Sequence, residues 1–371
     1  MPTPTKTVWP LEPHTRAKHE ILRRYLEAWT AILGLGGFKT IAYVDGFAGP
    51  GVYDNGEDGS PIIALKAALK HKDRISADLK FLFVEKNTER AAQLRESVAA
   101  HSLPKNFLVR IADGVSFEQG FRTHLLDPYK LKQRPLPPTF AFIDPFGWTK
   151  VPFDLVREIL GNPSCEVLIN FMYEEINRFI EHPDQGANFD LLFGTDAWRG
   201  VAKLSDARAR REFLHDLYRD QLRNVAGAQY VRSFEMRNRN DATDYFLFFA
   251  TNSARGMEKM KEAMWKVDES GEFRFSDATN PAQTLLFSPQ PNFAALRRAI
   301  LGEFEGRETT VAEVEEFVLA CTPFRVTHYK KQVLSELERE GKLVALNADA
   351  GRKARTYRDP SLKLRFEGTS I

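Results

Sequence analysis

Short apolar runs alternate with amphipathic segments through the first part of this chain, and this alternation limits the possible folds more than any other feature. The runs with the composition of buried strands are 41–44, 79–87, 106–114, 139–148 and 165–172. Strands joined through helices imply right-handed crossovers and a parallel sheet with helices on both faces. We therefore predict an α/β fold with a doubly wound, mostly parallel sheet.

Further elements extend this pattern in both directions along the chain. Apolar residues at helical spacing predict an amphipathic helix at 11–33, before the first strand. A basic helix is predicted at 203–224. After it, two apolar runs at 228–238 and 243–252 are separated by a short polar turn, which predicts an antiparallel end to the sheet.

A polar, glycine-containing segment predicts a domain boundary near residue 280. Beyond it, two helices at 310–324 and 327–343 precede a strand, a turn and a second strand within 343–359. Helix, turn, helix and hairpin in this order predict a winged helix-turn-helix. We expect residues 1–280 to form the sheet domain with its N-terminal helix, and residues 281–371 to form a small winged-helix domain.

Composition argues against several classes of protein. The longest apolar runs are too short to span a bilayer, and the N-terminal residues lack signal-peptide character, so we expect a soluble, cytoplasmic protein. Cys165 and Cys321 lie far apart without metal-ligand spacing, so we expect neither a disulfide framework nor a metal site. The net charge of +2 is uninformative, because 52 basic residues nearly balance 50 acidic ones.

Acidic residues stand where successive apolar runs end, at Asp45, Glu85, Asp113 and Asp144. In a doubly wound sheet, ligands bind beyond the carboxyl ends of the strands. Each acid alone is compatible with a solvated strand end. Together they indicate a ligand site at this edge of the sheet.

The turn after the first strand, "DGFAGPG" at 45–51, contains glycines that let the backbone approach a ligand closely. No Gly-Lys-Ser/Thr follows, so it is not a phosphate-binding loop, and it lacks the dinucleotide pattern G-x-G-x-x-G. An adenosyl cofactor with a sulfonium and an amino acid fits better. Asp45 would help to position the methionine moiety, Glu85 would accept hydrogen bonds from the ribose hydroxyls, and Asp113 would accept one from the adenine amine.

The first half of the chain resembles class I S-adenosylmethionine-dependent methyltransferases. The turn with Phe47, Gly49 and Gly51 is similar to their first motif, and "FVEKN", with Glu85, is similar to their second. "DPFG" at 144–147 is similar to the Asp-Pro-Pro-Tyr/Phe motif of amino-methyltransferases, without its second proline. The resemblance implies S-adenosylmethionine as the cofactor, bound by these residues.

In the resembled amino-methyltransferases, this last motif holds a planar amino group near the methyl donor. Carried over to this chain, Asp144 and the backbone at Pro145 would accept the hydrogens of the amine, and Phe146 would stack on the base. A cytosine-C5 mechanism would instead need a cysteine nucleophile. Cys165 stands at the start of a predicted strand, at the wrong end of the sheet for that role.

Over nearly its whole length, the chain resembles the three-Cys-motif partner family, bacterial proteins encoded beside a radical enzyme with a three-cysteine motif. The stretches that carry this resemblance are "HTRAKHEILRRYLEAW", "YVDGFAGPG", "GSPIIAL", "FIDPFG" and "TPFRVTHYKKQVLSELEREGKL". The resemblance implies that the radical enzyme is a partner.

Positive charge is concentrated in two segments. The segment from Arg199 to Arg239 contains ten basic and five acidic residues, and the segment from Arg325 to Arg365 contains eleven basic and five acidic residues. A solvated surface could explain either segment alone. In the second segment, however, the charges fall where a winged helix would meet DNA. The predicted nucleic-acid-binding residues are His328, Lys330 and Lys331 on the recognition helix, and Arg352, Lys353 and Arg355 on the wing.

These observations favour an S-adenosylmethionine-dependent methyltransferase that acts on nucleic acid, with a base amino group in DNA as the first candidate acceptor. One alternative is a non-catalytic protein that binds the cofactor or nucleic acid and partners the radical enzyme. Another is methylation of RNA or of a small molecule, with the winged helix serving regulation. A winged helix that docks a protein instead of DNA is also compatible with the charge pattern.

Overall fold

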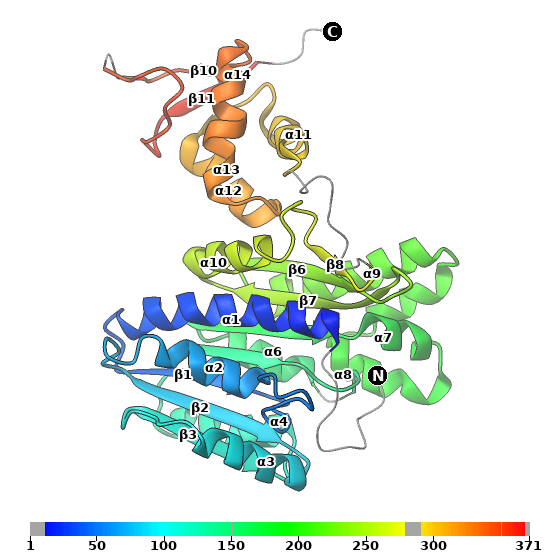
Figure 1. The fold of residues 1–371 in the computed structure, drawn as a ribbon. Helices are drawn as coiled ribbons and strands as arrows, with labels where there is room; N and C mark the ends of the chain where they lie inside the picture. Colours follow the sequence, from blue (N-terminus) through cyan, green and yellow to red (C-terminus); the bar gives the residue numbers. More distant parts are fainter. Residues whose placement is uncertain (1–11, 150, 279–290, 350, 368–371) are drawn as a thin grey trace. The chain divides into compact units, whose positions relative to one another are not determined.

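The computed structural model describes residues 12–149, 151–278, 291–349 and 351–367 (Figure 1). The chain divides into two compact units. The sheet unit comprises residues 1–263 and 274–283, and the C-terminal unit comprises residues 264–273 and 284–371. The predicted domain boundary near residue 280 lies outside the described residues.

The sheet unit contains one sheet with the strand order β3-β2-β1-β4-β5-β7-β6-β8. The strands β1 to β5 pair in parallel, whereas β7 is antiparallel to both β5 and β6. The predicted doubly wound, mostly parallel sheet with an antiparallel end is therefore confirmed. Because β7 lies between β5 and β6, the sheet differs from the 3-2-1-4-5-6 order of dinucleotide-binding folds. The strands are Thr40–Asp45, Asp78–Glu85, Phe107–Asp113, Thr139–Ile143, Cys165–Phe171, Tyr230–Arg237, Thr243–Thr251 and Arg274–Ser276.

The central strands are buried along their whole length. Every residue of β4, β5 and β7 is buried, which explains why these segments are continuous apolar runs rather than alternating ones. Polar side chains inside such strands are expensive to bury unless they have partners. Glu166 and Asn170 of β5 are therefore the residues whose surroundings need an explanation.

Helices cover this sheet. The first helix, α1 (Pro13–Gly34), packs beside α2 (Ser60–Leu69) and buries the stripe from Ile21 to Trp29 that the sequence predicted (Figure 1). The other helices of this unit are α3 (Thr88–Ala99), α4 (Phe117–Phe121), α5 (Asp127–Leu131), α6 (Phe153–Leu160), α7 (Tyr173–Phe179), α8 (Gly186–Phe193), α9 (Ala207–Asp220) and α10 (Ala254–Trp265), whose last two residues belong to the C-terminal unit. The helices α7 and α8 were not predicted from the sequence. In the described ranges, no helix has the length and apolar character needed to cross a membrane.

The C-terminal unit has the predicted helix-turn-helix and a small sheet of order β10-β11-β9. A helical segment from Val326 to Arg339 comprises α13, a π-helical turn and α14. The helix α11 and the strand β9 were not predicted. The bounds are α11 (Phe293–Phe304), β9 (Glu308–Thr310), α12 (Val311–Cys321), α13 (Val326–Tyr329), α14 (Ser335–Arg339), β10 (Leu343–Ala345) and β11 (Lys363–Phe366).

The predicted position of the second strand of the wing is wrong. The second strand was expected before residue 359, but it is β11, at Lys363–Phe366. Arg355 has a φ of 61°, a left-handed conformation that an extended strand cannot include. The side chains of Arg352 and Tyr357 instead fold back to Glu338 of α14. The segment before β11 is therefore a long loop.

Candidate cofactor and nucleic-acid sites

The glycine turn after β1 has the conformation that its sequence requires. Gly49 and Gly51 have φ values of 64° and 83°, which favour glycine. At Gly46, a Cβ atom would lie 2.7 Å from the ring of Phe117. The turn therefore passes so close to Phe117 that a side chain at Gly46 would force one of the two to move.

Glu85, the last residue of β2, ties two loops together with one carboxylate. Its Oε2 accepts a hydrogen bond of 2.9 Å from the Gly49 N–H, and its Oε1 accepts one of 2.7 Å from the Asn87 N–H. The side chain is buried. Each carboxylate oxygen can accept more than one hydrogen bond, so Glu85 retains capacity for hydroxyl donors of a ligand.

A cavity of about 550 Å³ opens beside this carboxylate. Its aromatic walls are Phe47, Phe117 and Phe146, and Glu85 and Arg90 also line it. The Arg90 guanidinium lies 5.9 Å from the centre of the Phe146 ring. Apolar walls with a few convergent polar groups are typical of small-molecule and cofactor sites.

Asp45, at the end of β1, is fully buried beneath the turn. Its carboxylate accepts hydrogen bonds of 3.3 Å from the Phe47 N–H and from the Tyr43 hydroxyl, and it interacts with the Ser60 hydroxyl. Burial raises the pKa of Asp45 to about 7, in opposition to these hydrogen bonds. Asp45 does not itself line the cavity.

Asp113, at the end of β3, lies apart from the cavity. Its side chain is 40% exposed and forms an ion pair of 2.9 Å with Arg95. The hydrogen bond from Arg95 lowers the pKa of this carboxyl group. The neighbouring segment, Val115 to Glu118, lines the cavity instead.

Asp144 follows β4 and has two partners that sequence analysis missed. Lys18 of α1 donates to its Oδ2 at 2.6 Å, and Asn170 of β5 donates to its Oδ1 at 2.7 Å. The Lys18 ammonium is buried and lies 5.3 Å from the centre of the Tyr245 ring. The sequence signals were a lysine within the buried stripe of α1 and an asparagine within an apolar strand.

Asn170 carries an unsatisfied acceptor. The Asp144 carboxylate can only accept hydrogen bonds, so it fixes the amide of Asn170 with its NH₂ group toward Asp144. The carbonyl oxygen, Oδ1, is buried and has no hydrogen-bond partner within the part of the chain that the structure describes. Such an acceptor is unusual in a protein interior and requires a partner from elsewhere.

The residues after Asp144 divide into two groups. Pro145 is buried, and Phe146 forms a wall of the cavity. Trp148 stacks on Phe189 of α8 with ring centroids 3.9 Å apart, so it serves packing. Cys165 is buried at the first residue of β5, and burial raises the pKa of its thiol to about 12, as a non-nucleophilic core cysteine would show.

The basic segment from Arg199 to Arg239 is largely neutralised by acids of its own unit. Ion pairs within the described ranges engage six of its ten basic residues, linking Arg199 to Asp190, Arg208 to Glu212, Arg210 to Glu181, Arg211 to Glu235, Arg219 to Asp216 and Arg237 to Asp241. The excess of basic residues in the sequence therefore overstates the charge that this face offers to a phosphate backbone.

The predicted nucleic-acid-binding residues of the C-terminal unit also divide into two groups. Arg352 pairs with Glu338, Lys330 pairs with Glu315, and His328 packs against the rings of Trp265 and Phe293. The other predicted residues have no ion pair within the described ranges, and they are Lys331, Lys353 and Arg355. Cations without acidic neighbours are the better candidates for phosphate contacts.

A comparison with protein-family models supports the predicted winged helix in the C-terminal part of the chain. Residues 274–350 match a family model described as GMT-like wHTH domain. No curated protein matches the sequence significantly.

Similar solved structures include a protein from Legionella pneumophila, LPL1258, with 14% identity and a TM-score of 0.39, over 65% of this chain and 85% of that one. They also include Trm1 from Pyrococcus horikoshii in complex with S-adenosyl-L-methionine, with 10% identity and a TM-score of 0.35. That match covers 72% of this chain and 62% of Trm1. At this level of similarity, neither structure identifies a substrate for this chain.

Proposed function

We propose that this chain is an S-adenosylmethionine-dependent methyltransferase that acts on nucleic acid, with a base amino group in DNA as the acceptor. The observation that carries the proposal is the cavity of about 550 Å³ beside Glu85, next to the glycine turn and walled by Phe47 and Phe146. In the proposed complex, Glu85 holds the ribose hydroxyls and the aromatic side chains enclose the adenine. S-adenosylmethionine supplies the methyl group when it is bound.

Electrostatics support a cationic cofactor near the turn. Asp45 is buried below the turn, and an ionised Asp45 would attract the sulfonium and ammonium charges of the methionine moiety. The Asp113 carboxylate is engaged by Arg95 and does not line the cavity. The adenine amine would then be recognised by the segment that contains Ser116.

The acceptor amine would be held by Asp144 and Asn170 acting together. Asp144 turns the Asn170 amide so that its buried carbonyl oxygen is left without a partner, and an amino hydrogen that reached this oxygen would satisfy it. Asp144 and the backbone at Pro145 would accept the other hydrogen, and Phe146 would stack on the base. Acceptors in this arrangement direct the nitrogen lone pair toward the methyl group, which is catalysis by positioning.

The proposal also includes a particular family and a particular partner for this chain. Membership of the three-Cys-motif partner family, and a radical enzyme as partner, rest on the sequence stretches quoted above. A second function has one observation in its favour: both oxygens of Asp144 already have partners, Lys18 and Asn170. A chain that binds the cofactor without transferring its methyl group would tolerate that arrangement.

Methyl transfer from labelled S-adenosylmethionine to duplex DNA, single-stranded DNA and RNA tests the proposal, with calorimetry of cofactor binding on the same preparation. We expect micromolar to millimolar cofactor binding and transfer to DNA. Asp144→Ala should leave cofactor affinity nearly unchanged and slow single-turnover transfer by two or more orders of magnitude, about 3 kcal/mol in the transition state.

The control for Asp144→Ala is Asp154→Ala, an exposed acid in the first turn of α6. Its replacement should leave both cofactor binding and transfer unchanged. Cofactor binding without transfer to any nucleic acid would favour the non-catalytic alternative. Absence of cofactor binding at millimolar concentration would refute the whole assignment.

A further inference from the structure

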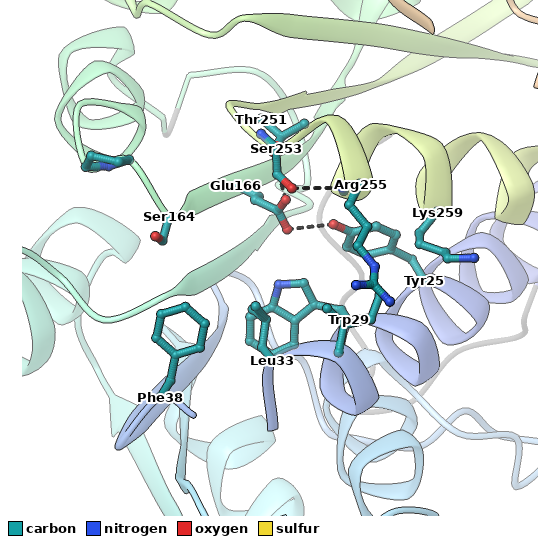
Figure 2. Close-up of a pocket in the computed structure, with 13 residues that line it drawn as sticks. Tyr25, Trp29, Leu33, Phe38, Ser164, Glu166, Thr251, Ser253, Arg255 and Lys259 are labelled. Carbon is teal, nitrogen blue, oxygen red and sulfur yellow. Dashed lines mark hydrogen bonds between the residues drawn. The ribbon is translucent and has the colours of Figure 1, made fainter. Parts of the chain in front are cut away.

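A second cavity lies at the opposite end of the sheet from the proposed cofactor site. Its volume is about 210 Å³, and its lining residues come from α1, the start of β5, the end of β7 and the N-terminal end of α10 (Figure 2). Glu166 is the second residue of β5, whereas Asn170, which contacts Asp144, is near the other end of the same strand. The proposed methyl transfer therefore has no use for this cavity.

The floor of the cavity is a buried acid with satisfied hydrogen bonds. The Glu166 carboxylate accepts a hydrogen bond of 2.6 Å from the Tyr25 hydroxyl and one of 2.7 Å from the Thr251 hydroxyl (Figure 2). Burial raises the pKa of this carboxyl group. Gly256 of α10 covers it so closely that a Cβ atom there would lie 2.2 Å from Oε1. Glu166 is therefore a structural floor and is not open to a ligand.

Trp29 of α1 presents a donor without a partner in this cavity. The side chain is 4% exposed, and its indole nitrogen lies on the ring edge toward Glu166 (Figure 2). The indole N–H lies near the Glu166 carboxylate and opposes the rise in the pKa of that group, but its geometry is too poor for a hydrogen bond, so the N–H has no hydrogen-bond acceptor among the described residues. A buried N–H group of this kind marks a place where an additional acceptor fits.

The rim of the cavity is cationic and its wall is apolar. Apart from the covered Glu166, the charged lining residues are Arg255 and Lys259 of α10. Lys259 pairs with Glu262 at 2.8 Å, whereas Arg255 is exposed and has no ion pair in the described ranges. Phe38, which is 39% exposed, faces the same space as Trp29.

We propose that this cavity binds a small aromatic monocarboxylate. The ring lies between Trp29 and Phe38, and the carboxylate binds the Arg255 guanidinium, whose fork of N–H groups matches carboxylate geometry. The volume admits a single ring with a short side chain, since an engineered cavity of about 150 Å³ holds benzene. The site is separate from the proposed cofactor site and does not depend on the proposed function.

Calorimetric titration of the full chain with 3-phenylpropionate tests this site, with 3-phenylpropanol and propionate as probes that lack the charge or the ring. We expect saturable binding of 3-phenylpropionate, at least tenfold tighter than that of either other probe. Arg255→Gln should weaken 3-phenylpropionate about tenfold and leave 3-phenylpropanol unchanged. Arg74→Gln, which removes an exposed cation elsewhere on the sheet unit, should change neither.

Three results would overturn the proposal. One is the absence of saturable binding by the wild-type chain at millimolar probe. Another is equal weakening in Arg255→Gln and Arg74→Gln, which would indicate a general charge effect. The third is displacement of 3-phenylpropionate by S-adenosylhomocysteine, which would place the probe in the larger cavity beside Glu85. Failure of cofactor binding with retained probe binding would leave this site standing and reject only the proposed methyltransferase.

Discussion

At the scale of single residues, the acids at the strand ends have similar positions in the sequence, each at the end of an apolar run, but different environments in the structure. Asp113 is exposed and ion-paired, Glu85 is buried and holds two backbone N–H groups, and Asp45 is buried with a raised pKa. The sequence places all of them at one edge of the sheet. Their separate environments depend on how deeply the neighbouring loops cover each strand end, which spacing alone does not specify.

Asp45 should make stability depend on pH in a predictable direction. Its pKa is about 7 in the folded chain and near the ordinary aspartate value, about 4, in the unfolded chain. The native state therefore binds the proton more tightly, so the contribution of Asp45 to stability falls as pH rises from about 4 to 7. An asparagine at position 45 cannot ionise, so its contribution to stability does not fall over this pH range.

The measurement is urea unfolding of Asp45→Asn and wild type between pH 4 and 8. The free energy of unfolding of the variant minus that of wild type should rise by about 2–4 kcal/mol from pH 4 to pH 8. This rise does not depend on the value of the difference at pH 4. Other buried acids, such as Glu166, titrate in both proteins and cancel in the difference. A difference that does not vary with pH would show that Asp45 is ionised throughout.

At the scale of secondary-structure elements, alternation and strand ends made the strands β1 to β5 and the antiparallel β6–β7 pair predictable, whereas α7, α8 and β8 were not predicted. Contacts between distant elements were not predictable. Lys18 and Asp144 are 126 residues apart, and only the packing of α1 on the sheet brings them together. The same limit applies to the loop before β11, where a side-chain interaction with α14 replaces the expected strand.

The contact between α10 and β5 yields a prediction at this scale. Alanine normally stabilises a helix over glycine by about 0.5–1 kcal/mol. Gly256→Ala should instead destabilise α10 by about 1–3 kcal/mol, because the added Cβ would overlap the Glu166 carboxylate. Hydrogen exchange of the amides of α10 reports the local opening free energy.

Gly302 of α11 is the matched control, because a Cβ atom there would meet no atom within 4 Å. Gly302→Ala should slow exchange in α11 and follow the ordinary helix preference. If both substitutions stabilise their helices, Glu166 and α10 are not in the tight contact described above.

At the scale of the whole molecule, the proposed function divides capture and chemistry between the two units. The chain is nearly neutral overall, with a net charge of +2, so general attraction to nucleic acid is weak. In the part of the chain that the structure describes, six of the ten basic residues of the segment from Arg199 to Arg239 are paired with acids. Capture of a phosphate backbone would then depend on the cations of the C-terminal unit that lack acidic partners.

Charge reversal of these cations should therefore impair capture and spare chemistry. In the triple variant Lys331→Glu, Lys353→Glu and Arg355→Glu, we expect the KM for DNA to rise at least tenfold at low salt. The slope of log affinity against log salt should fall by up to about 0.9 per lost phosphate contact. Cofactor affinity and kcat at saturating DNA should not change, because the substituted residues belong to the C-terminal unit and the proposed reacting groups to the sheet unit.

The control carries the same change in net charge on the sheet unit, through Lys72→Glu, Arg74→Glu and Lys105→Glu at exposed positions. Both variants have equal net charge, so a difference between them isolates the location of the charge from its amount. We expect the control to retain most of the DNA affinity and its salt dependence. If both variants lose affinity equally, capture depends on overall charge and the winged helix has no specific role in it. If only the control loses affinity, DNA binds the sheet unit, and the winged helix becomes the candidate for docking a protein partner.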